Sequence, residues 1–317
     1  MKRKICIEVT TFNEEENVEL MYETLTAIMQ RETSYDYALY FVDNHSEDTT
    51  EEKLRAMAAR DKHVKVILNL RNFGPNRSGA NGFYAMDGDA YICLPCDFQG
   101  PPELIPTFLR EWEKGAKVVW GKKTASGESK LMWHVRSLYY KIIRYFSDVK
   151  MYEQITGFGL YDREVVKRME AAGDPIPYFR NLIPELGYEP AMVEFVQPAR
   201  ERGKSSYNLY RYFNEAMASL VNTSQVPLKI ATVIGFVLGL LSFCLGLAYL
   251  VLKLAFWDYF PTGTAPILIG MFFLGSVQIF FIGIVGEYVG EILTRVTHHP
   301  RVVEKERLNF DDEETAQ

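Results

Sequence analysis

Asp97 stands at a position where an acid could bind a cation. It follows the apolar run 90–94, AYICL, and precedes the segment FQGPP. An acid placed where a strand ends either binds a ligand or accepts the backbone N–H groups of a turn. Two interpretations of Asp97 are therefore open at this point: a metal ligand without a partnering acid, or the cap of a turn.

Polar residues also follow three other apolar runs, each of which is predicted to be a strand. In parallel sheets, ligands bind beyond the carboxyl ends of the strands. Any one polar group could cap a turn, but four together predict a bound polar molecule, and their acids and amides suit ribose hydroxyls and a metal. The four groups are Thr10, Thr11 and Asn13; Asp43, Asn44 and Ser46; Arg71 and Asn72; and Asp97 with Gln99.

A further candidate group is basic. Arg200, Arg202 and Lys204 lie within five residues of one another. Arginine forks and lysine ammonium groups are both suited to binding phosphate. Lys122 and Arg136 are additional candidates for the same phosphate site. The alternative is that these charges serve only to orient a nearby membrane span.

Alternating strands and helices are predicted to position these residues. Val18, Met21 and Leu25 show the spacing of a helix, for which Asn13 would be the cap. Strand–helix alternation predicts an α/β fold with a mainly parallel sheet covered on both faces. The predicted strands are 4–10, 37–43, 64–70 and 90–94, and the predicted helices are 13–30, 47–60 and one that begins at residue 76.

The second half of the chain is predicted to meet a membrane. The runs 230–252 and 259–286 carry no charge, and each exceeds the roughly 20 apolar residues that a membrane-spanning helix needs. Aromatic and basic residues mix at helical spacing in 135–149 and 207–229, which is typical of interfacial helices. An ordinary amphipathic helix is the alternative, above all for 135–149. The polar tail after Arg301 is expected to be disordered.

Charge and cysteine content limit the compartment and the partners. Acids follow the basic start within a few residues, so we expect no signal peptide, and positive charge flanks both apolar runs, which predicts two passes with both termini cytoplasmic. The net charge of −6 argues against nucleic acid as a partner. Cys93 and Cys96 form a C-x-x-C, but Cys93 ends a strand instead of beginning a helix, which disfavours a redox role.

Six segments occur in order before the apolar runs. They are VTTFNEEENV, VDNHSEDTT, RNFG, GDAYICLPCDFQGPPE, ITGFGLYDREVV and RERGKSSY. With this ordered set, nearly the whole chain resembles the family 2 glycosyltransferases, which have the GT-A fold, a Rossmann-like α/β catalytic domain. More narrowly it resembles the polyprenyl-phosphate glycosyltransferases, the group that contains dolichol-phosphate mannose synthase and bacterial undecaprenyl-phosphate sugar transferases.

The resemblance implies roles for individual residues. Asp43 would hold the base or ribose of a nucleotide. Asp97 would bind Mg²⁺ or Mn²⁺ together with the diphosphate, with Gln99 close to that ion. The remaining matches are Thr10, Asn13 and Glu14, at the nucleotide-binding start of the domain, and Arg200, Arg202, Lys204 and Ser205, in a basic loop that resembles the acceptor-phosphate clamp.

The chain also departs from the family pattern. The first acid of the D-x-D motif is Pro95, and the second acid of the D-D-G-S motif is Asn44, with His45 where glycine is common. Residues 156–159, TGFG, lack the acid and the arginine of the T-G-D-F-R motif. A lone Asp97 should bind metal more weakly than a pair of acids, although Mg²⁺ often takes one or two carboxylates plus substrate phosphates.

The missing acid bears on the acceptor. A sugar hydroxyl needs a general base, whereas a phosphate monoester is already mostly anionic at neutral pH, because its second pKa is about 6. The sequence therefore predicts inverting transfer of one sugar onto polyprenyl phosphate at the cytoplasmic face of the cell membrane, for a cell-envelope glycan. Asp97, Arg200, Arg202 and Lys204 are the candidate catalytic residues.

Two other functions stay open. One is transfer to a sugar hydroxyl, with Glu185 or Asp162 as the base. The other is a non-catalytic, membrane-anchored nucleotide-sugar-binding protein. The expected partners are a UDP- or GDP-linked sugar, the lipid phosphate, the membrane and further copies in a homo-oligomer. The predicted parts are a catalytic domain at 1–205, a juxtamembrane helix at 206–228, two transmembrane helices at 229–293 and a polar tail at 294–317.

Overall fold

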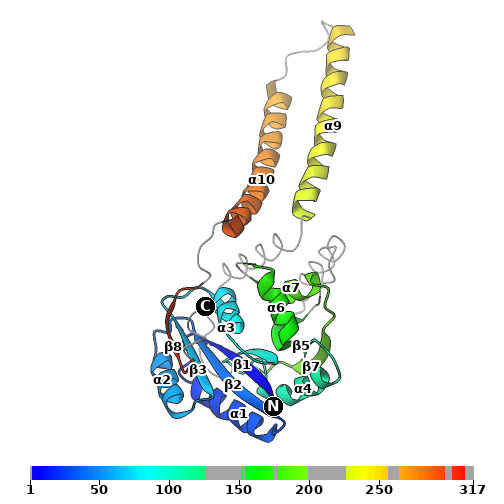
Figure 1. Ribbon diagram of the computed structural model, residues 1–317. Helices are drawn as coiled ribbons and strands as arrows, with labels where there is room; N and C mark the ends of the chain where they lie inside the picture. Colours follow the sequence, from blue (N-terminus) through cyan, green and yellow to red (C-terminus); the bar gives the residue numbers. More distant parts are fainter. Residues whose placement is uncertain are drawn as a thin grey trace. The chain divides into compact units, whose positions relative to one another are not determined.

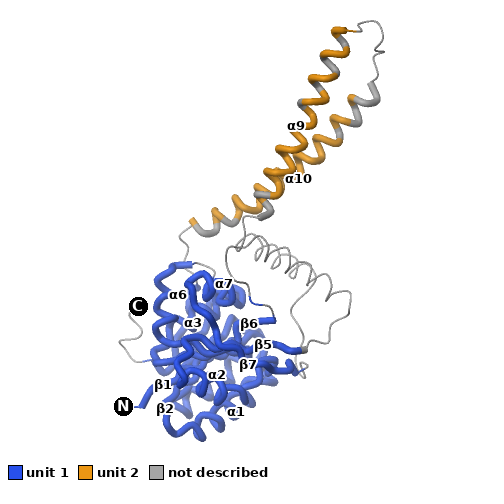
Figure 2. The backbone as a smooth tube through the Cα atoms, turned by 90° about the vertical axis from the view of Figure 1, so that its right-hand side faces the viewer, with its two compact units in different colours: residues 1–140, 149–206, 299–317 blue, residues 141–148, 207–298 orange. Residues whose placement is uncertain are grey.

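The computed structural model divides into two compact units, which are described separately (Figure 2). One comprises residues 1–140, 149–206 and 299–317, and the other 141–148 and 207–298. The structure describes residues 2–125, 152, 154–174, 177–198, 226–255, 264–296 and 302–310. The predictions for Arg136, Arg200, Arg202, Lys204 and Ser205, and for most of the two interfacial helices, lie outside the described residues.

The first unit is built on one mixed sheet, with strand order β7-β5-β6-β4-β1-β2-β3-β8 (Figure 1). The neighbouring strands β4, β1, β2 and β3 are parallel, whereas β6 and β8 are antiparallel to their neighbours. The predicted α/β fold is confirmed, and the sheet is mixed, with the parallel strands β4, β1, β2 and β3 at its centre. The strands are β1 (Arg3–Thr11), β2 (Tyr35–Asp43), β3 (Val64–Asn69), β4 (Ala90–Pro95), β5 (Val118–Ala125), β6 (Ile155–Asp162), β7 (Ala191–Val196) and β8 (Glu304–Leu308).

Helices cover both faces of this sheet. The helices α1, α2 and α4 pack with one buried cluster of side chains, and α3, α6 and α7 pack with another on the opposite face. The apolar strands are buried on both faces for this reason. The helical bounds are α1 (Val18–Arg31), α2 (Thr50–Arg60), α3 (Pro75–Tyr84), η1 (Pro102–Leu104), α4 (Ile105–Glu113), α6 (Arg163–Ala171) and α7 (Phe179–Glu185).

The start of α1 differs from the prediction. The predicted buried positions Val18, Met21 and Leu25 are confirmed. However, the helix begins at Val18 and not at Asn13, so the assignment of Asn13 as its cap is wrong. Asn13 has a φ of 55° and its side chain accepts a hydrogen bond from the backbone N–H of Glu47. That cross-loop bond replaces the capping role.

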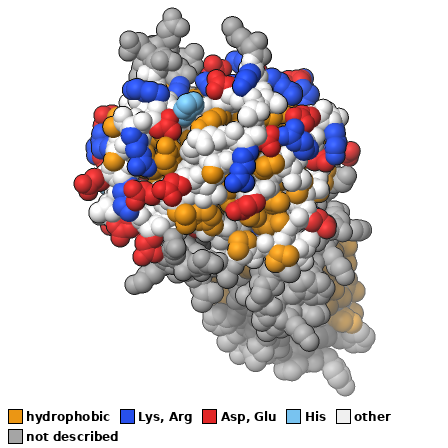
Figure 3. All heavy atoms as spheres, turned by 90° about the horizontal axis from the view of Figure 1, so that it is seen from below, with side chains coloured by type: hydrophobic (Ala, Val, Ile, Leu, Met, Phe, Trp, Pro, Cys, Tyr) orange, Lys and Arg blue, Asp and Glu red, His pale blue; other side chains and the backbone are white. Residues whose placement is uncertain are grey.

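The tail after Arg301 is a second correction. Residues 304–308, EKERL, form β8, which pairs antiparallel with β3. The expectation of disorder is therefore wrong for this segment. The charged sequence of this segment does not predict a strand. β8 is held by backbone hydrogen bonds to β3 and by ion pairs to α2. On the face of the first unit that Figure 3 shows, charged side chains of both signs surround scattered apolar ones.

The second unit contains two long apolar helices. They are α9 (Val226–Ala255) and α10 (Thr264–Val296). Among the described residues, Phe273–Gly290 of α10 is long and apolar enough to cross a membrane, with a mean hydropathy of 1.5. The apolar stretch found in α9, Ile230–Ser242, is shorter. By length and composition the structure supports one of the two predicted spans, and the second remains a prediction.

Candidate functional site

The register of the sheet brings the predicted polar groups to one edge. Thr11 of β1 lies opposite Asp43 of β2, and Thr10 lies opposite Pro95 of β4. Asp97 follows two residues after Pro95. Since only β1 separates β2 from β4, the strands that lead to Asp43 and Asp97 are roughly 10 Å apart. A ligand of nucleotide size could contact both.

Asp43 is buried, and much of its carboxylate is used within its own loop. It accepts hydrogen bonds from Thr11 Oγ1 at 3.2 Å, from Ser46 N at 2.9 Å and from Ser46 Oγ at 2.5 Å. Burial raises the pKa of Asp43, and the hydrogen bonds from Ser46 and Thr11 oppose that rise. An ionised carboxylate has about four acceptor positions. Asp43 therefore fixes the loop at 44–46 and keeps little capacity for a ligand.

Hydrogen bonds join the segments that follow β1 and β2. Asn13 N donates to Ser46 Oγ at 2.9 Å, and Glu14 N donates to Thr50 Oγ1 at 2.9 Å. Asn13 and His45 both have the left-handed backbone, with φ of 55° and 67°. That conformation is costly outside glycine and persists where surrounding bonds enforce it. The loops that begin at Thr10 and Asp43 are thus shaped in advance of any ligand.

A network of amides joins the loops after β2 and β3. Asn44 Nδ2 donates to Asn72 Oδ1 at 2.9 Å, and Asn44 Oδ1 accepts from Phe73 N at 2.9 Å. Asn69 Nδ2 donates to Ser78 Oγ at 2.8 Å and to Asn44 Oδ1 at 3.3 Å. An ionised aspartate could not donate as Asn44 does. The family departure at Asn44 is therefore explained by this network.

Two members of the network, Asn69 and Ser78, were missed by sequence reasoning. Both are buried, at 1% exposed. The sequence features that could have identified them are their positions: Asn69 ends an apolar run, and Ser78 lies in the first turn of the helix that follows. Arg71, by contrast, is exposed, and its guanidinium lies 3.9 Å from the centre of the Phe73 ring. It is available to a ligand at this edge.

Asp97 caps a turn with one oxygen, and the prediction that it binds a metal depends on the other oxygen. One oxygen accepts Gln99 N at 3.1 Å, as in a turn cap, and Phe98 between them has a φ of 58°. The other oxygen has no partner among the residues that the structure describes, and the side chain is half-buried. Within the same residues, no three His, Cys, Asp or Glu side chains gather as a metal cluster. One free oxygen fits a divalent cation held mainly by a diphosphate.

The third family motif forms an apolar cluster next to Gly100, three residues after Asp97. Phe158 is 2% exposed and packs on Phe108 and Phe195, with ring centroids 5.0 and 5.9 Å apart. A Cβ added at Gly159 would lie 2.2 Å from the Val119 carbonyl oxygen, so the motif's phenylalanine does not fit there. Leu160, at the position of the motif's arginine, is fully buried. Apolar packing thus replaces the acid and the arginine of the motif.

The structure excludes one of the two candidate general bases, Asp162, and leaves the other, Glu185, untested. Asp162 lies opposite Ala90, at the start of β4, which is the far edge of the sheet from Asp97. Burial would raise its pKa, but hydrogen bonds from Trp112, Glu164 N and Lys117 lower it overall. Asp162 as a general base is therefore wrong. Glu185 ends the short helix α7, and its role stays a prediction.

The predicted phosphate-binding residues are only partly described. Lys122, near the end of β5, forms an ion pair with Glu194 at 3.1 Å, and both side chains are exposed. Because β6 is antiparallel to both β4 and β5, and β7 is parallel to β5, the strands β4, β5 and β7 all end at the same side of the sheet. β7 ends at Val196, and Arg200 follows four residues later. The chain that carries the basic loop therefore leaves the sheet at the edge of Asp97.

A buried acid lies beneath this edge. Glu8 of β1 is fully buried, and among the described residues neither of its oxygens has an N–H or O–H donor. Burial raises the pKa of Glu8 to about 8, and the thiol of Cys93 offsets this weakly. Burial also raises the pKa of Cys93 well above its usual value. A protonated thiol is a poor nucleophile, which disfavours redox chemistry at Cys93.

Comparison with known proteins identifies relatives along the whole chain. Residues 6–169 match the family model described as glycosyl transferase family 2, and residues 226–292 match the GtrB C-terminal hairpin. The bactoprenol glucosyl transferase of Shigella phage SfV is 30% identical over 303 residues, which covers 95% of this chain and 98% of that protein. The prophage bactoprenol glucosyl transferase homolog of Escherichia coli (strain K12) is 29% identical, with the same coverage.

Solved structures are more distant. The crystal structure of glucosyl-3-phosphoglycerate synthase from Mycobacterium tuberculosis, in complex with Mn²⁺, uridine diphosphate and phosphoglyceric acid, is 17% identical with a TM-score of 0.44. The match covers 68% of this chain and 75% of that chain. A likeness at this level carries no inference about individual residues here.

Proposed function

Because the chain belongs to glycosyl transferase family 2, we propose that it moves one sugar from a nucleotide diphosphate sugar onto a polyprenyl phosphate. The observation that carries this proposal is the similarity to bactoprenol glucosyl transferases, which spans 95% of the chain. The match to a separate hairpin model over 226–292 adds support, because it lies outside the catalytic domain.

On the donor side, the loops after β2 and β3 are the proposed nucleotide site. Asp43 and Ser46 shape the first loop, and Asn72 and Arg71 present an exposed amide and a cation from the second. Asp97, with Gln99, is the proposed ligand for Mg²⁺ or Mn²⁺. When bound, such an ion neutralises charge on the leaving diphosphate.

On the acceptor side, the proposed nucleophile is a phosphate oxygen of the lipid. Its attack forms a bond to the anomeric carbon, and the bond from that carbon to the nucleoside diphosphate breaks, so the configuration inverts. The lipid phosphate is mostly a dianion above about pH 6 and needs no base. The apolar Phe158 and the remote Asp162 are consistent with that chemistry. A product with the donor's anomeric configuration would contradict it.

The acceptor phosphate is proposed to meet the basic loop. Arg200, Arg202, Lys204 and Ser205, with Arg136, are its candidate contacts, and all lie outside the described residues. Lys122 lies at the correct edge, but its ammonium already pairs with Glu194. We therefore expect Lys122 to contribute least among these cations.

A two-pass topology is proposed on grounds of connectivity, and the positive charge that flanks both apolar runs is the basis for proposing that the catalytic domain faces the cytoplasm. β8 follows α10 in the chain and is hydrogen-bonded to β3 of the catalytic sheet. The segment after α10 therefore lies on the same side of a membrane as the sheet. A single crossing between β7 and β8 would place it on the opposite side. If α10 crosses the bilayer, α9 must cross as well.

The test is a transfer assay with purified protein in detergent. Undecaprenyl phosphate, a panel of labelled UDP- and GDP-sugars and Mg²⁺ or Mn²⁺ would be incubated with and without a chelator. The proposal predicts label in the organic phase from one donor, and only with the metal. Intact nucleotide binding without transfer from any donor would favour another acceptor or a binding protein.

A further inference from the structure

The strand β8 connects the apolar helices to the nucleotide edge of the sheet. α10 ends at Val296 and the backbone of Val303 already bonds to the sheet, where Leu70 N donates to Val303 O at 3.0 Å. β8 therefore begins beside the loop that follows β3.

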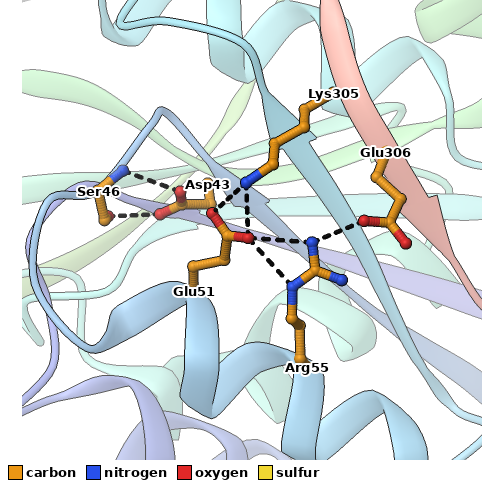
Figure 4. Close-up of polar contacts among 6 residues, drawn as sticks. All are labelled: Asp43, Ser46, Glu51, Arg55, Lys305 and Glu306. Carbon is orange, nitrogen blue, oxygen red and sulfur yellow. Dashed lines mark hydrogen bonds and ion pairs between the residues drawn. The ribbon is translucent and has the colours of Figure 1, made fainter.

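On one face of the sheet, β8 forms ion pairs with α2. Lys305 Nζ lies 2.9 and 3.0 Å from the two oxygens of Glu51. Arg55 bonds to Glu51 at 3.0 Å and to Glu306 at 2.6 Å, which closes a network of two cations and two acids (Figure 4). Each acid in this network is therefore balanced by a cation.

On the other face, β8 contacts α3. Asn81 Nδ2 donates to Glu304 Oε1 at 2.6 Å. In the ladder with β3, Glu304 lies opposite Asn69, which bonds to both Asn44 and Ser78. β8 therefore supports the elements behind both nucleotide loops, with α2 following the first loop and α3 following the second.

The Lys305–Glu51 pair lies close to Asp43. Figure 4 shows Glu51, from the first turn of α2, reaching toward the Asp43–Ser46 turn, with the Lys305 ammonium beside it. Burial and, to a smaller extent, the charge of Glu51 raise the pKa of Asp43. The negative field of Glu51 therefore reaches the loop where an anionic nucleotide would bind. Lys305 and Arg55 offset that field.

We propose that Lys305 is a positioning residue for the nucleotide sugar: it balances Glu51 beside the Asp43–Ser46 turn and holds α2 behind that turn. This inference rests on the proposed nucleotide site. The competing explanation is that β8 only covers the edge of β3, which protects a sheet from pairing with other chains. The two explanations differ in what they predict for nucleotide affinity.

The first experiment compares Lys305→Ala, Lys305→Arg and Lys114→Ala in the full-length protein. Lys114→Ala is the matched control, since it removes an exposed lysine that pairs with Glu111 on α4. We expect Lys305→Ala to raise the KM for the donor about two- to fivefold, as for one exposed ion pair. kcat should stay unchanged, because the lost interaction is uniform binding.

Two further signatures belong to the same experiment. Lys305→Arg should restore the wild-type KM, and the effect of Lys305→Ala should shrink at high salt, because exposed charges are screened. Equal KM values for Lys305→Ala, Lys114→Ala and the wild type would overturn the proposal. A loss of thermal stability in Lys305→Ala with an unchanged KM would overturn it in favour of simple edge protection.

The second experiment removes the charge that Lys305 balances. In Lys305→Ala combined with Glu51→Gln, the acid is no longer unbalanced, so nucleotide affinity should return to within about twofold of the wild type, as additivity fails for paired charges. Additive losses would contradict the electrostatic role.

Titrations with UDP and GDP alone, using Asp43→Asn as the reference, separate the two proposals. If Asp43→Asn weakens binding and Lys305→Ala does not, only the inference about Lys305 fails. If neither variant weakens binding, the nucleotide site is elsewhere, and both the site and this inference fail.

Discussion

The two halves of the candidate site differ in how much of their polar capacity the protein itself uses. At the ends of β1, β2 and β3, many polar side chains bond to one another, although Asn69 Oδ1 has no partner among the described residues. Asp43 accepts three hydrogen bonds, and Asn44 bonds to both Asn72 and Phe73. At the end of β4, Asp97 accepts one bond and leaves one oxygen free among the described residues. Phe158, which lies against Gly100 three residues after Asp97, is apolar.

This difference indicates a division of labour. The half that contains Asp43 is rigid before any ligand arrives, which suits recognition of a fixed group such as a nucleotide. The half that contains Asp97 has unused capacity, which suits a cation that the donor's diphosphate brings with it. A substitution in the first half should therefore change affinity and stability, and a substitution at Asp97 should change turnover.

The largest effect is expected at Asp97. Asp97→Asn keeps the turn bond to Gln99 but weakens the free acceptor, so turnover should fall at least about 100-fold, on the scale of other lost charge-stabilising groups. The thermal midpoint should not move. Asp36→Asn is the matched control, since Asp36 is exposed and also accepts a backbone N–H, at the far end of β2. Full activity in Asp97→Asn would make Asp97 a turn cap only.

An intermediate effect is expected at Asn44. Asn44→Asp removes the donor to Asn72 and places a charge at a buried site, which should cost about 1–3 kcal/mol in the free energy of unfolding. Nucleotide binding should weaken about tenfold, since 1.4 kcal/mol is a factor of ten. Calorimetric titration and thermal unfolding would measure both. Gln30→Glu, on the exposed end of α1, makes the same exchange of groups and should change neither.

A third prediction compares Glu8 with Asp43, two buried acids on neighbouring strands. Asp43 has donors and Glu8 has none among the described residues. The pKa of Glu8 is raised from 4.5 to about 8, so the folded protein retains a proton that the unfolded chain releases in that range. Stability should therefore fall as pH rises from 4.5 to 8, by up to about 1.4 kcal/mol per pH unit from this group.

Glu8→Gln tests this prediction, because it cannot release a proton. Thermal unfolding of the variant should depend less on pH between 5 and 8 than that of the wild type, and the two curves should converge toward low pH. Parallel curves would show that Glu8 is ionised in the folded protein. Asp43→Asn should flatten the curve less, because hydrogen bonds from Ser46 and Thr11 oppose the rise in the pKa of Asp43.

The smallest effect is expected at Lys122. Its ammonium is paired with Glu194 and both side chains are exposed, so Lys122→Ala should change the KM for lipid phosphate less than about twofold. Arg202→Ala, in the basic loop, is the comparison and should raise that KM by more. A tenfold loss in Lys122→Ala would place the acceptor phosphate at β5.

Local patterns were enough to predict much of the fold. The apolar runs identified the four strands from β1 to β4, and the spacing of Val18, Met21 and Leu25 identified the buried face of α1. The shared edge of the polar groups followed from a general property of parallel sheets. These features depend on neighbouring residues or on fold class alone, which a single sequence contains.

Features that depend on distant partners could not be predicted. β8 is a run of charged residues whose partners in α2 lie about 250 positions earlier, with separations of 251 and 254 for two of the bonds. From sequence alone, Asn69 and Ser78 have the character of turn residues. Only the structure shows that Asn69 bonds to both Ser78 and Asn44. The sequence around Asn13 predicts a helix cap, but in the structure its side chain accepts a hydrogen bond from the backbone N–H of Glu47.

The central claim, that the acceptor is a lipid phosphate needing no protein base, is tested most directly by a pair of acceptors. Purified protein would be given undecaprenyl phosphate or undecaprenol, with the donor found in the panel and the same metal. Label should enter the organic phase only with the phosphate, and its incorporation should follow ionisation of that phosphate near pH 6. Equal transfer to undecaprenol would require a general base in the protein and would contradict the account.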